Sequence, residues 1–220
     1  MRKIIWRINK FLNKTIKVSL FDELYWKFRK DFTGDWKQGG YWESKDHPHR
    51  KIVLDTLEKE GNAHFTLAEV GSNCGPNLEV IRRKFPYTGL SGLDISKKAV
   101  EEGRGRGLDL TEGKADMLPW KDKSYDYVLA DAVLMYIGPD KILKVIEEML
   151  RVTKKKVIII DFHKKNANPL GEVEVGHWVR DYESLFAKYG LQVKVRKITE
   201  EEWPGSYSWK KLGYLITVDI

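Results

Sequence analysis

Glycine and acidic residues recur at three places where a sheet of parallel strands could bind a nucleoside. Glu69-Val70-Gly71-Ser72-Asn73-Cys74-Gly75 follows one apolar run, Asp94 ends the next, and Asp116-Met117 follows a third. Glycine lets a ligand approach the backbone closely. A carboxylate at the end of the second strand can accept hydrogen bonds from both ribose hydroxyls, and a side chain after the third can meet an adenine edge. Taken singly, the glycines could be ordinary turn residues and Asp94 could cap the next helix. The three motifs in this order, each after a strand, predict a nucleoside-type ligand.

The residues around these motifs alternate between patterns typical of strands and of helices. Short apolar runs predict strands over 65–70, 88–94, 108–113, 125–131, 157–162, 191–198 and 213–220. Helical spacing and capping residues predict helices over 48–61, 77–84, 96–102, 141–151 and 182–189. The segment 33–47, rich in glycine and aromatic residues, is expected to be a loop. Such alternation implies a mostly parallel sheet covered by helices on both faces.

In the order of these motifs, residues 65–220 resemble the class I S-adenosylmethionine-dependent methyltransferases. Residues 69–75 are similar to the first motif of that family, 93–96 to the second, 115–119 to the adenine-contacting third, and 125–137 to the fourth. The resemblance implies an α/β, Rossmann-like three-layer sandwich with a mostly parallel seven-stranded sheet, an antiparallel last strand and an N-terminal helical extension. It also implies a methyltransferase whose cofactor, S-adenosylmethionine, is bound by Tyr41, Arg50, Glu69, Gly71, Ser72, Asn73, Gly75, Asp94, Ile95, Asp116, Met117 and Asp131.

Two departures from the family pattern bear on the turn and on the substrate. Asn73 stands where glycine is usual, and asparagine tolerates a left-handed backbone better than other non-glycine residues. The Asn-Pro-Pro-Tyr signature of base or amide nitrogen methylation is absent, and residues 131–134 read Asp-Ala-Val-Leu instead. We therefore expect a small-molecule, sugar or lipid-linked acceptor rather than DNA adenine. A dehydrogenase is disfavoured because residues 71–75 do not supply Gly-x-Gly-x-x-Gly.

Methyl transfer from a sulfonium needs alignment of the acceptor and, for some acceptors, a general base. The candidates for catalysis are His49, Tyr136 and His163, with His177 weighed beside them, and a structural role is open for each. His47 and His49 have no third ligand nearby, so we expect no metal. Tyr41-Trp42 resembles the Tyr-Trp of the N-terminal lids of some small-molecule methyltransferases. It could close over the methionine moiety, or it could plug the core.

The basic charge is concentrated at the N-terminus. The net charge is +7, and residues 1–30 hold nine Lys and Arg against Asp22 and Glu23. We predict a helical and loop cap over 1–47 on a methyltransferase domain over 48–220, because the apolar side chains of the cap must cover something, and the acceptor pocket is the open side of this fold. The alternative for 1–30 is contact with a membrane surface. The runner-up function is an RNA or protein methyltransferase that uses the basic helix for docking.

The cysteine content and the charge of the chain limit its possible compartment and binding partners. Cys74 is the single cysteine, which excludes an intrachain disulfide and favours a reducing compartment. We expect a cytoplasmic protein, with peripheral membrane contact through residues 1–30 left open. The residues after 30 sum to zero charge, so nucleic acid is not an expected partner.

Overall fold

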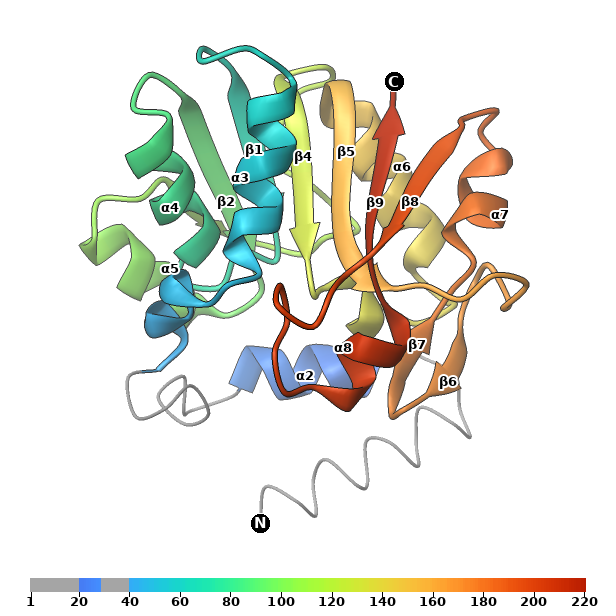
Figure 1. Ribbon diagram of the computed structural model, residues 1–220. Coiled ribbons are helices and arrows are strands. Elements are labelled where there is room, and N and C mark those ends of the chain that lie inside the picture. Colours follow the sequence, from blue (N-terminus) through green and yellow to red (C-terminus); the bar gives the residue numbers. More distant parts are fainter. Residues whose placement is uncertain (1–19, 29–39) are drawn as a thin grey trace.

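The computed structural model describes residues 20–28 and 40–220, and its centre is a seven-stranded sheet (Figure 1). The strand order is β3-β2-β1-β4-β5-β9-β8. β9 is antiparallel to β5 and to β8, and the remaining pairs are parallel. This confirms the predicted Rossmann-like sheet with an antiparallel last strand. The strands are β1 (Thr66–Val70), β2 (Gly89–Asp94), β3 (Leu110–Glu112), β4 (Tyr125–Asp131), β5 (Thr153–Phe162), β8 (Val193–Lys197) and β9 (Gly213–Asp219).

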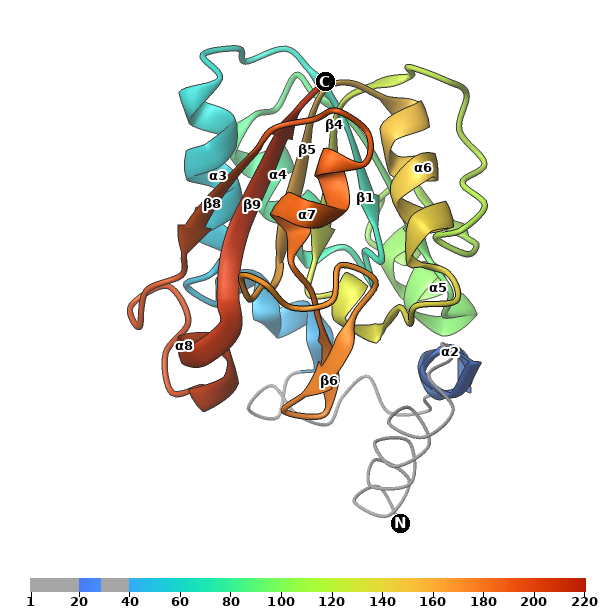
Figure 2. The ribbon, with the colours of Figure 1, turned by 90° about the vertical axis from the view of Figure 1, so that its right-hand side faces the viewer.

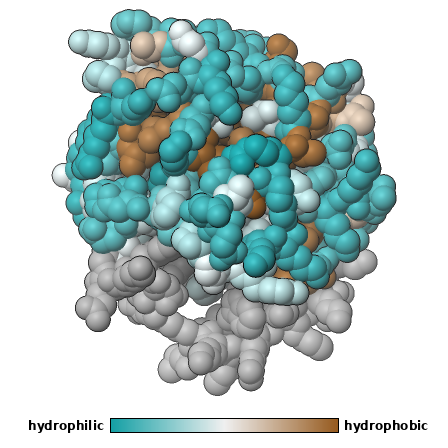
Figure 3. Space-filling view, viewed as in Figure 1, coloured by the Kyte–Doolittle hydropathy of each residue, from teal (hydrophilic) through white to brown (hydrophobic). Residues whose placement is uncertain are grey.

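Helices cover both faces of the sheet, as Figure 2 shows along its edge. Alternate residues of a strand point to opposite faces. Leu67 of β1 accordingly joins one apolar cluster with α3 (Arg50–Lys59), α4 (Pro76–Lys84) and α5 (Lys97–Gly105), while its neighbour Ala68 joins a second cluster with α6 (Ile142–Val152) and α7 (Tyr182–Ala187). The outer face that carries α3 and α4 is largely hydrophilic, with apolar patches between the helices (Figure 3).

Several short elements lie at the carboxyl edge of the parallel strands, below the sheet in Figure 1. They are α2 (Leu20–Phe28), the hairpin of β6 (Glu172–Glu174) and β7 (His177–Val179), and α8 (Tyr207–Leu212). Ligands of open α/β sheets bind at this edge, so these elements surround the expected site. In the described part of the chain, no helix is both long and apolar enough to cross a membrane.

Two expectations about local structure were wrong, and two elements were not predicted. Tyr41–Asp46 is a 3-10 helix, η1, held by a bond from Ser44 Oγ to the Tyr41 carbonyl (2.6 Å), where a loop was predicted. α3 begins at Arg50, later than expected, because His47 to His49 are tied by turn bonds to residues 50–52. The β6–β7 hairpin turns through Val175 and Gly176 at positive φ, and a valine there gives no turn signal. α8 was missed, although Ser206 caps it. Of the predicted cap, residues 1–19 and 29–39 lie outside the described residues.

Candidate functional site

A cavity that is open to solvent lies between α2 and the carboxyl ends of β1, β2 and β4. Its empty space, counted with the solvent at its mouth, is about 1040 Å³. Eight of the residues predicted to bind the cofactor line it: Tyr41, Arg50, Gly71, Asn73, Asp94, Ile95, Asp116 and Asp131. The other four do not. Glu69 and Ser72 are buried behind the wall, Gly75 starts α4, and Met117 is 74% exposed. The sheet therefore brings together residues from most of the predicted motifs.

The turn after β1 is shaped by its backbone. Gly71 has a φ of +73°, and a Cβ built there would lie 2.4 Å from Val133 Cγ2. The Gly71 and Ser72 N–H groups donate to the Leu93 carbonyl at 2.7 and 3.0 Å, which ties the turn to the end of β2. Asn73 has a φ of +51°, so it adopts the left-handed backbone that the sequence analysis required of it. Only a residue without a side chain fits at 71.

Asp94 ends β2 with its carboxylate oriented by two backbone groups. The Asn73 N–H donates to Oδ2 and the Ser96 N–H to Oδ1, both at 2.8 Å. Burial raises the pKa of Asp94 to about 6, against these two hydrogen bonds. The carboxylate lines the cavity, and each of its oxygens has a lone pair left for another donor. It can therefore accept the hydroxyl groups of a ribose.

Asp131, at the end of β4, accepts three hydrogen bonds on one carboxylate oxygen. Oδ2 accepts from Arg50 Nη1 (2.6 Å), His49 Nε2 (3.1 Å) and Asn77 Nδ2 (2.9 Å). Burial alone would raise the pKa of Asp131, but the neighbouring His49 and the Arg50 guanidinium hold it well below its usual range. Oδ1 is buried without a partner among the described residues. An orphaned carboxylate oxygen in the wall of a cavity fits an incoming ammonium group.

Glu69 lies behind Asp131 and carries a second orphaned oxygen. Its Oε1 accepts from Asn77 Nδ2 at 2.6 Å, while Oε2 is buried without a partner among the described residues. Burial raises the pKa of Glu69 to about 8, and Asp131 adds to the shift. The carboxyl group is therefore mostly protonated at neutral pH. Together with Arg50, a cation that can meet a carboxylate, these groups fit the methionine end of S-adenosylmethionine.

His49 lines the cavity with both ring nitrogens engaged. Nε2 faces Asp131, and Nδ1 contacts Nδ1 of His47. The ring also packs on Trp203 at a centroid distance of 4.1 Å. Burial, with the positive charge of Arg50, lowers the pKa of His49 to about 4. The geometry suits a side chain that orients Asp131, and it leaves no nitrogen directed at an acceptor.

Tyr136 lines the cavity from η2 (Leu134–Tyr136), a short 3-10 helix after β4. The buried Arg180 donates from Nη1 to the Leu134 carbonyl at 2.7 Å, and Asp161 Oδ2 accepts from the Met135 N–H at 3.0 Å. Tyr136 meets Trp26 of α2 edge-on, with a centroid distance of 5.0 Å. Buried polar groups thus fix the segment that presents Tyr136 to the cavity.

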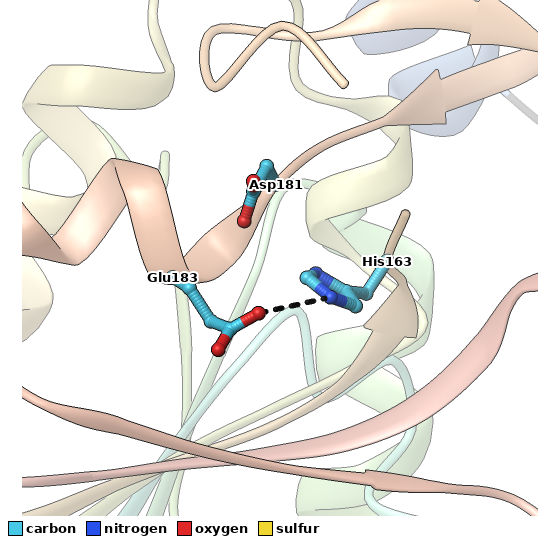
Figure 4. A group of neighbouring side chains, drawn as sticks. All are labelled: His163, Asp181 and Glu183. Carbon is cyan, nitrogen blue, oxygen red and sulfur yellow. Dashed lines mark ion pairs between the residues drawn. The ribbon is translucent and has the colours of Figure 1, made fainter. Parts of the chain in front are cut away.

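His163, the third candidate for catalysis, is buried outside the lining of the cavity beside Asp181 and Glu183 (Figure 4). The Tyr182 N–H donates to His163 Nδ1 at 3.2 Å, so the neutral ring carries its proton on Nε2, which faces Glu183 Oε2 at 3.8 Å. Asp181 caps α7. A histidine that binds a metal donates from its other nitrogen, and this one accepts. The geometry favours a structural role in anchoring α7.

Sequence reasoning missed several lining residues because their segments are far apart in the chain. Glu23 of α2 pairs with Lys114 (3.2 Å) and with Lys141, which is also 3.6 Å from Asp116. Trp203 comes from the segment before α8. Asn77, which lies behind the lining and donates to Glu69 and Asp131, had a usable signal, since it stands in the first turn of the helix that follows the glycine motif. The others have no local pattern that marks them.

Comparison with known proteins agrees with this geometry. Residues 68–160 match the family model described as a methyltransferase domain. An uncharacterised protein of Methanocaldococcus jannaschii, MJ1123, is 37% identical over 76 residues, which is 34% of this chain and about a third (36%) of that relative. Magnesium protoporphyrin IX methyltransferase of Synechocystis PCC 6803, solved with bound S-adenosylmethionine, superposes with a TM-score of 0.63 at 13% identity over 98% of this chain and 96% of that one.

A second structural neighbour is a geranyl diphosphate methyltransferase, with a TM-score of 0.58 at 14% identity over 77% of this chain and 76% of that one. At these identities the likeness concerns the fold. The matched domain over residues 68–160, the fold and the motifs together support a class I S-adenosylmethionine-dependent methyltransferase with S-adenosylmethionine as its cofactor. The resemblance drawn from the sequence is confirmed.

Proposed function

We propose that this protein transfers the methyl group of S-adenosylmethionine to a small-molecule, sugar or lipid-linked acceptor that enters the cavity between α2 and the sheet. The observation that carries the proposal is that α2 covers this cavity. Asp22, Glu23 and Trp26 of α2 line it opposite Asp94 and Asp131. An RNA or protein substrate would have to displace α2 to bring its backbone near the cofactor. A concave site that combines aromatic and apolar walls with a set of polar groups is typical of small-molecule sites.

The cofactor supplies an activated methyl group on its sulfonium, and the residues of the chain supply binding and alignment. Asp94 holds the ribose hydroxyls, and the space beside Gly71 lets the cofactor approach the backbone. Arg50 and Asp131 bind the carboxylate and ammonium of the methionine moiety. Tyr41 and Tyr136, both in the lining, exclude water from the acceptor side. Holding the two reactants in line accounts for much of the acceleration expected of such an enzyme.

Calorimetry with S-adenosylhomocysteine tests the cofactor assignment. Asp94→Ala is expected to weaken binding by about 10- to 100-fold, since hydrogen bonds to a charged group contribute roughly 1.5–3 kcal/mol. Asp109→Ala is the control, because Asp109 is exposed at the start of β3 and bonds Ser91 rather than the cavity. If Asp94→Ala and Asp109→Ala bind S-adenosylhomocysteine with equal affinity, Asp94 does not bind the cofactor. A mass-spectrometric screen of sugars, lipids and small metabolites then identifies the acceptor.

A further inference from the structure

Two buried oxygen atoms without partners belong to side chains that are already joined by a hydrogen bond. Asn77 Nδ2 donates to Glu69 Oε1 at 2.6 Å, yet Asn77 Oδ1 and Glu69 Oε2 have no partner among the described residues. The two residues expose only 1% and 2% of their surfaces. A buried acceptor without a donor is costly, so two of them in one contact call for a common explanation.

One proton on Glu69 Oε2 satisfies both oxygens. A protonated carboxyl group donates from one oxygen and accepts on the other, and a primary amide donates from its nitrogen and accepts on its oxygen. The Asn77 N–H already bonds to Glu69 Oε1, so a Glu69 O–H that donates to Asn77 Oδ1 closes a ring of two hydrogen bonds. An ionised carboxylate has no hydrogen to donate and leaves both oxygens without a partner.

The charges on the other side of Asn77 favour the neutral acid. Asn77 Nδ2 also donates to Asp131 Oδ2 at 2.9 Å, so two carboxyl groups share one amide nitrogen. Among the described contacts of these two carboxyl groups, Arg50 is the single cation, and it binds Asp131 rather than Glu69. His49 bonds to Asp131 as well, but burial lowers its pKa to about 4 and leaves it neutral.

Glu69 is enclosed by polar groups from four elements of the fold. Asp131 of β4 and Asp94 of β2 place negative charge near it, while Arg50 of α3 and Asn77 of α4 act in the opposite sense. Burial is the largest influence, and it raises the pKa of Glu69 to about 8. Glu69 is therefore neutral at a pH where Asp131 is ionised.

The pair lies directly behind the wall of the cavity. Glu69 is opposite Leu129 in the β1–β4 register, and Asp131 follows Leu129 on the same face of β4. Asp131 lines the cavity, whereas Glu69 and Asn77 do not. An Asn77 side chain that is fixed by Glu69 keeps its second N–H on Asp131 Oδ2, which leaves Asp131 Oδ1 available to another donor.

We propose that Glu69 is a neutral carboxylic acid, paired with Asn77 through two hydrogen bonds, and that this pair positions Asp131 for the methionine end of the cofactor. Glu69 is then a positioning residue rather than a counter-charge for the ammonium group. The proposal rests on the binding of the methionine moiety by Arg50 and Asp131 proposed above. Its consequence is that the hydrogen bonds of Glu69 matter for cofactor binding and its charge does not.

Infrared spectroscopy of the full-length protein with isotope-labelled glutamate carboxyl groups tests the protonation. A protonated carboxyl band that shifts with the label is expected for the free protein at neutral pH, and it should disappear in Glu69→Gln. The label separates Glu69 from Asp94 and Asp161, whose pKa values are also raised by burial. Glu101→Gln, which alters an exposed acid of α5, is the control and should keep the band. Absence of the labelled band in the wild type would mean that Glu69 is ionised and would overturn the proposal.

Calorimetry with S-adenosylhomocysteine tests the positioning. Glutamine keeps a donor and an acceptor for Asn77, so Glu69→Gln should bind within about threefold of the wild type, whereas Glu69→Leu and Asn77→Leu should each weaken binding by about fivefold or more. The double variant of Glu69→Leu and Asn77→Leu should lose less than the two single losses combined, because the two side chains act as a unit. Equal losses in Glu69→Gln and Glu69→Leu would show that the charge is required and would overturn the proposal.

The pH dependence of stability gives a second comparison of Glu69→Gln with the wild type. The unfolded chain releases the proton of Glu69 near the ordinary pKa of 4.5, whereas the folded protein holds it up to about 8. The folded state therefore binds more protons between these values. From about pH 5 to 8 the wild type should lose stability relative to Glu69→Gln, by up to about tenfold in the unfolding constant for each pH unit. Denaturation curves whose difference is flat over this range would contradict the proposal.

Failure of the proposed function is distinguishable from failure of this inference. If S-adenosylhomocysteine does not bind the wild-type protein, or binds Asp131→Asn with undiminished affinity, the assignment of the methionine end is refuted. The infrared band and the stability profile of the free protein still decide whether Glu69 is the neutral partner of Asn77.

Discussion

The two halves of the cavity are built in different ways. The cofactor half comes mainly from one stretch of chain, residues 69–96, with Arg50, Asp116 and Asp131 beside it. It depends on backbone N–H groups, a glycine at positive φ and buried carboxylates. The acceptor half comes from the side chains of α2, η1, η2 and Trp203, which are far apart in sequence. The first half is fixed once the sheet forms, whereas the second depends on the docking of separate segments. Substitutions in the two halves should therefore separate cofactor binding from acceptor binding.

The largest effect is expected for Gly71→Ala, in the cofactor half. A side chain at a φ of +73° costs about 1–2 kcal/mol, and its Cβ would meet Val133 Cγ2 at 2.4 Å, which adds overpacking of about 1–3 kcal/mol. The turn must shift, so the protein should lose stability by about 2–5 kcal/mol and lose measurable S-adenosylhomocysteine binding. Chemical denaturation and calorimetry measure the two quantities.

A matched glycine separates strain from crowding at this position. Gly61 has a φ of +68° and no atom within 4 Å of a built Cβ. Gly61→Ala should therefore cost only the strain and leave cofactor affinity unchanged. Pairing Gly71→Ala with Val133→Ala removes both methyl groups that crowd the new side chain, and this should recover part of the lost stability. If Gly71→Ala behaves like Gly61→Ala in both measurements, the close packing of the turn does not matter for binding.

The next largest effect concerns the pH dependence of cofactor binding through Asp94. Burial raises the pKa of this carboxyl to about 6, and the ribose hydroxyls need the ionised form as acceptor. Below about pH 6 the free protein holds a proton on Asp94, and the cofactor must displace it. The affinity for S-adenosylhomocysteine should therefore fall as the pH is lowered through 6, by up to about tenfold for each further pH unit. Calorimetry from pH 5 to 8 checks this, and a flat profile would contradict it.

The contrast between the halves also explains what the sequence could predict. The strands and the expected cofactor residues around Gly71 and Asp94 follow from local patterns, because glycine turns and strand ends leave a signal within a few residues. His163 follows a strand as a site residue would, yet its ring is turned toward α7 by the Tyr182 N–H, a tertiary contact without a local signal. Trp203 is placed by packing against His49 and by stacking on Trp209 at 3.6 Å. No spacing in the chain indicates that contact.

A smaller and more selective effect is expected for Tyr136→Leu in the acceptor half. Its ring faces Trp26 at 5.0 Å, while the loop that carries it is held independently by Arg180 and Asp161. Loss of one aromatic pair is worth about 0.5–1.5 kcal/mol, so the KM for the acceptor should rise about 2- to 10-fold. Affinity for S-adenosylhomocysteine should stay within about twofold. A parallel loss of cofactor affinity would show that the two halves are not independent.

The smallest effect tests how α2 is attached to the cofactor half. Glu23 bridges Lys114 and Lys141, and Lys141 lies 3.6 Å from Asp116, so α2 rests on the side chains that flank the expected adenine position. Partly exposed ion pairs contribute about 0–1 kcal/mol and are screened by salt. In the wild type, the KM for the acceptor should therefore rise modestly as salt is increased. Glu23→Gln should raise the KM at low salt by up to about fivefold and lose most of that salt dependence.

The matched control is Glu183→Gln, which alters an acid away from the cavity. A Glu23→Gln enzyme with wild-type KM and an unchanged salt response would mean that these ion pairs do not hold α2 in place.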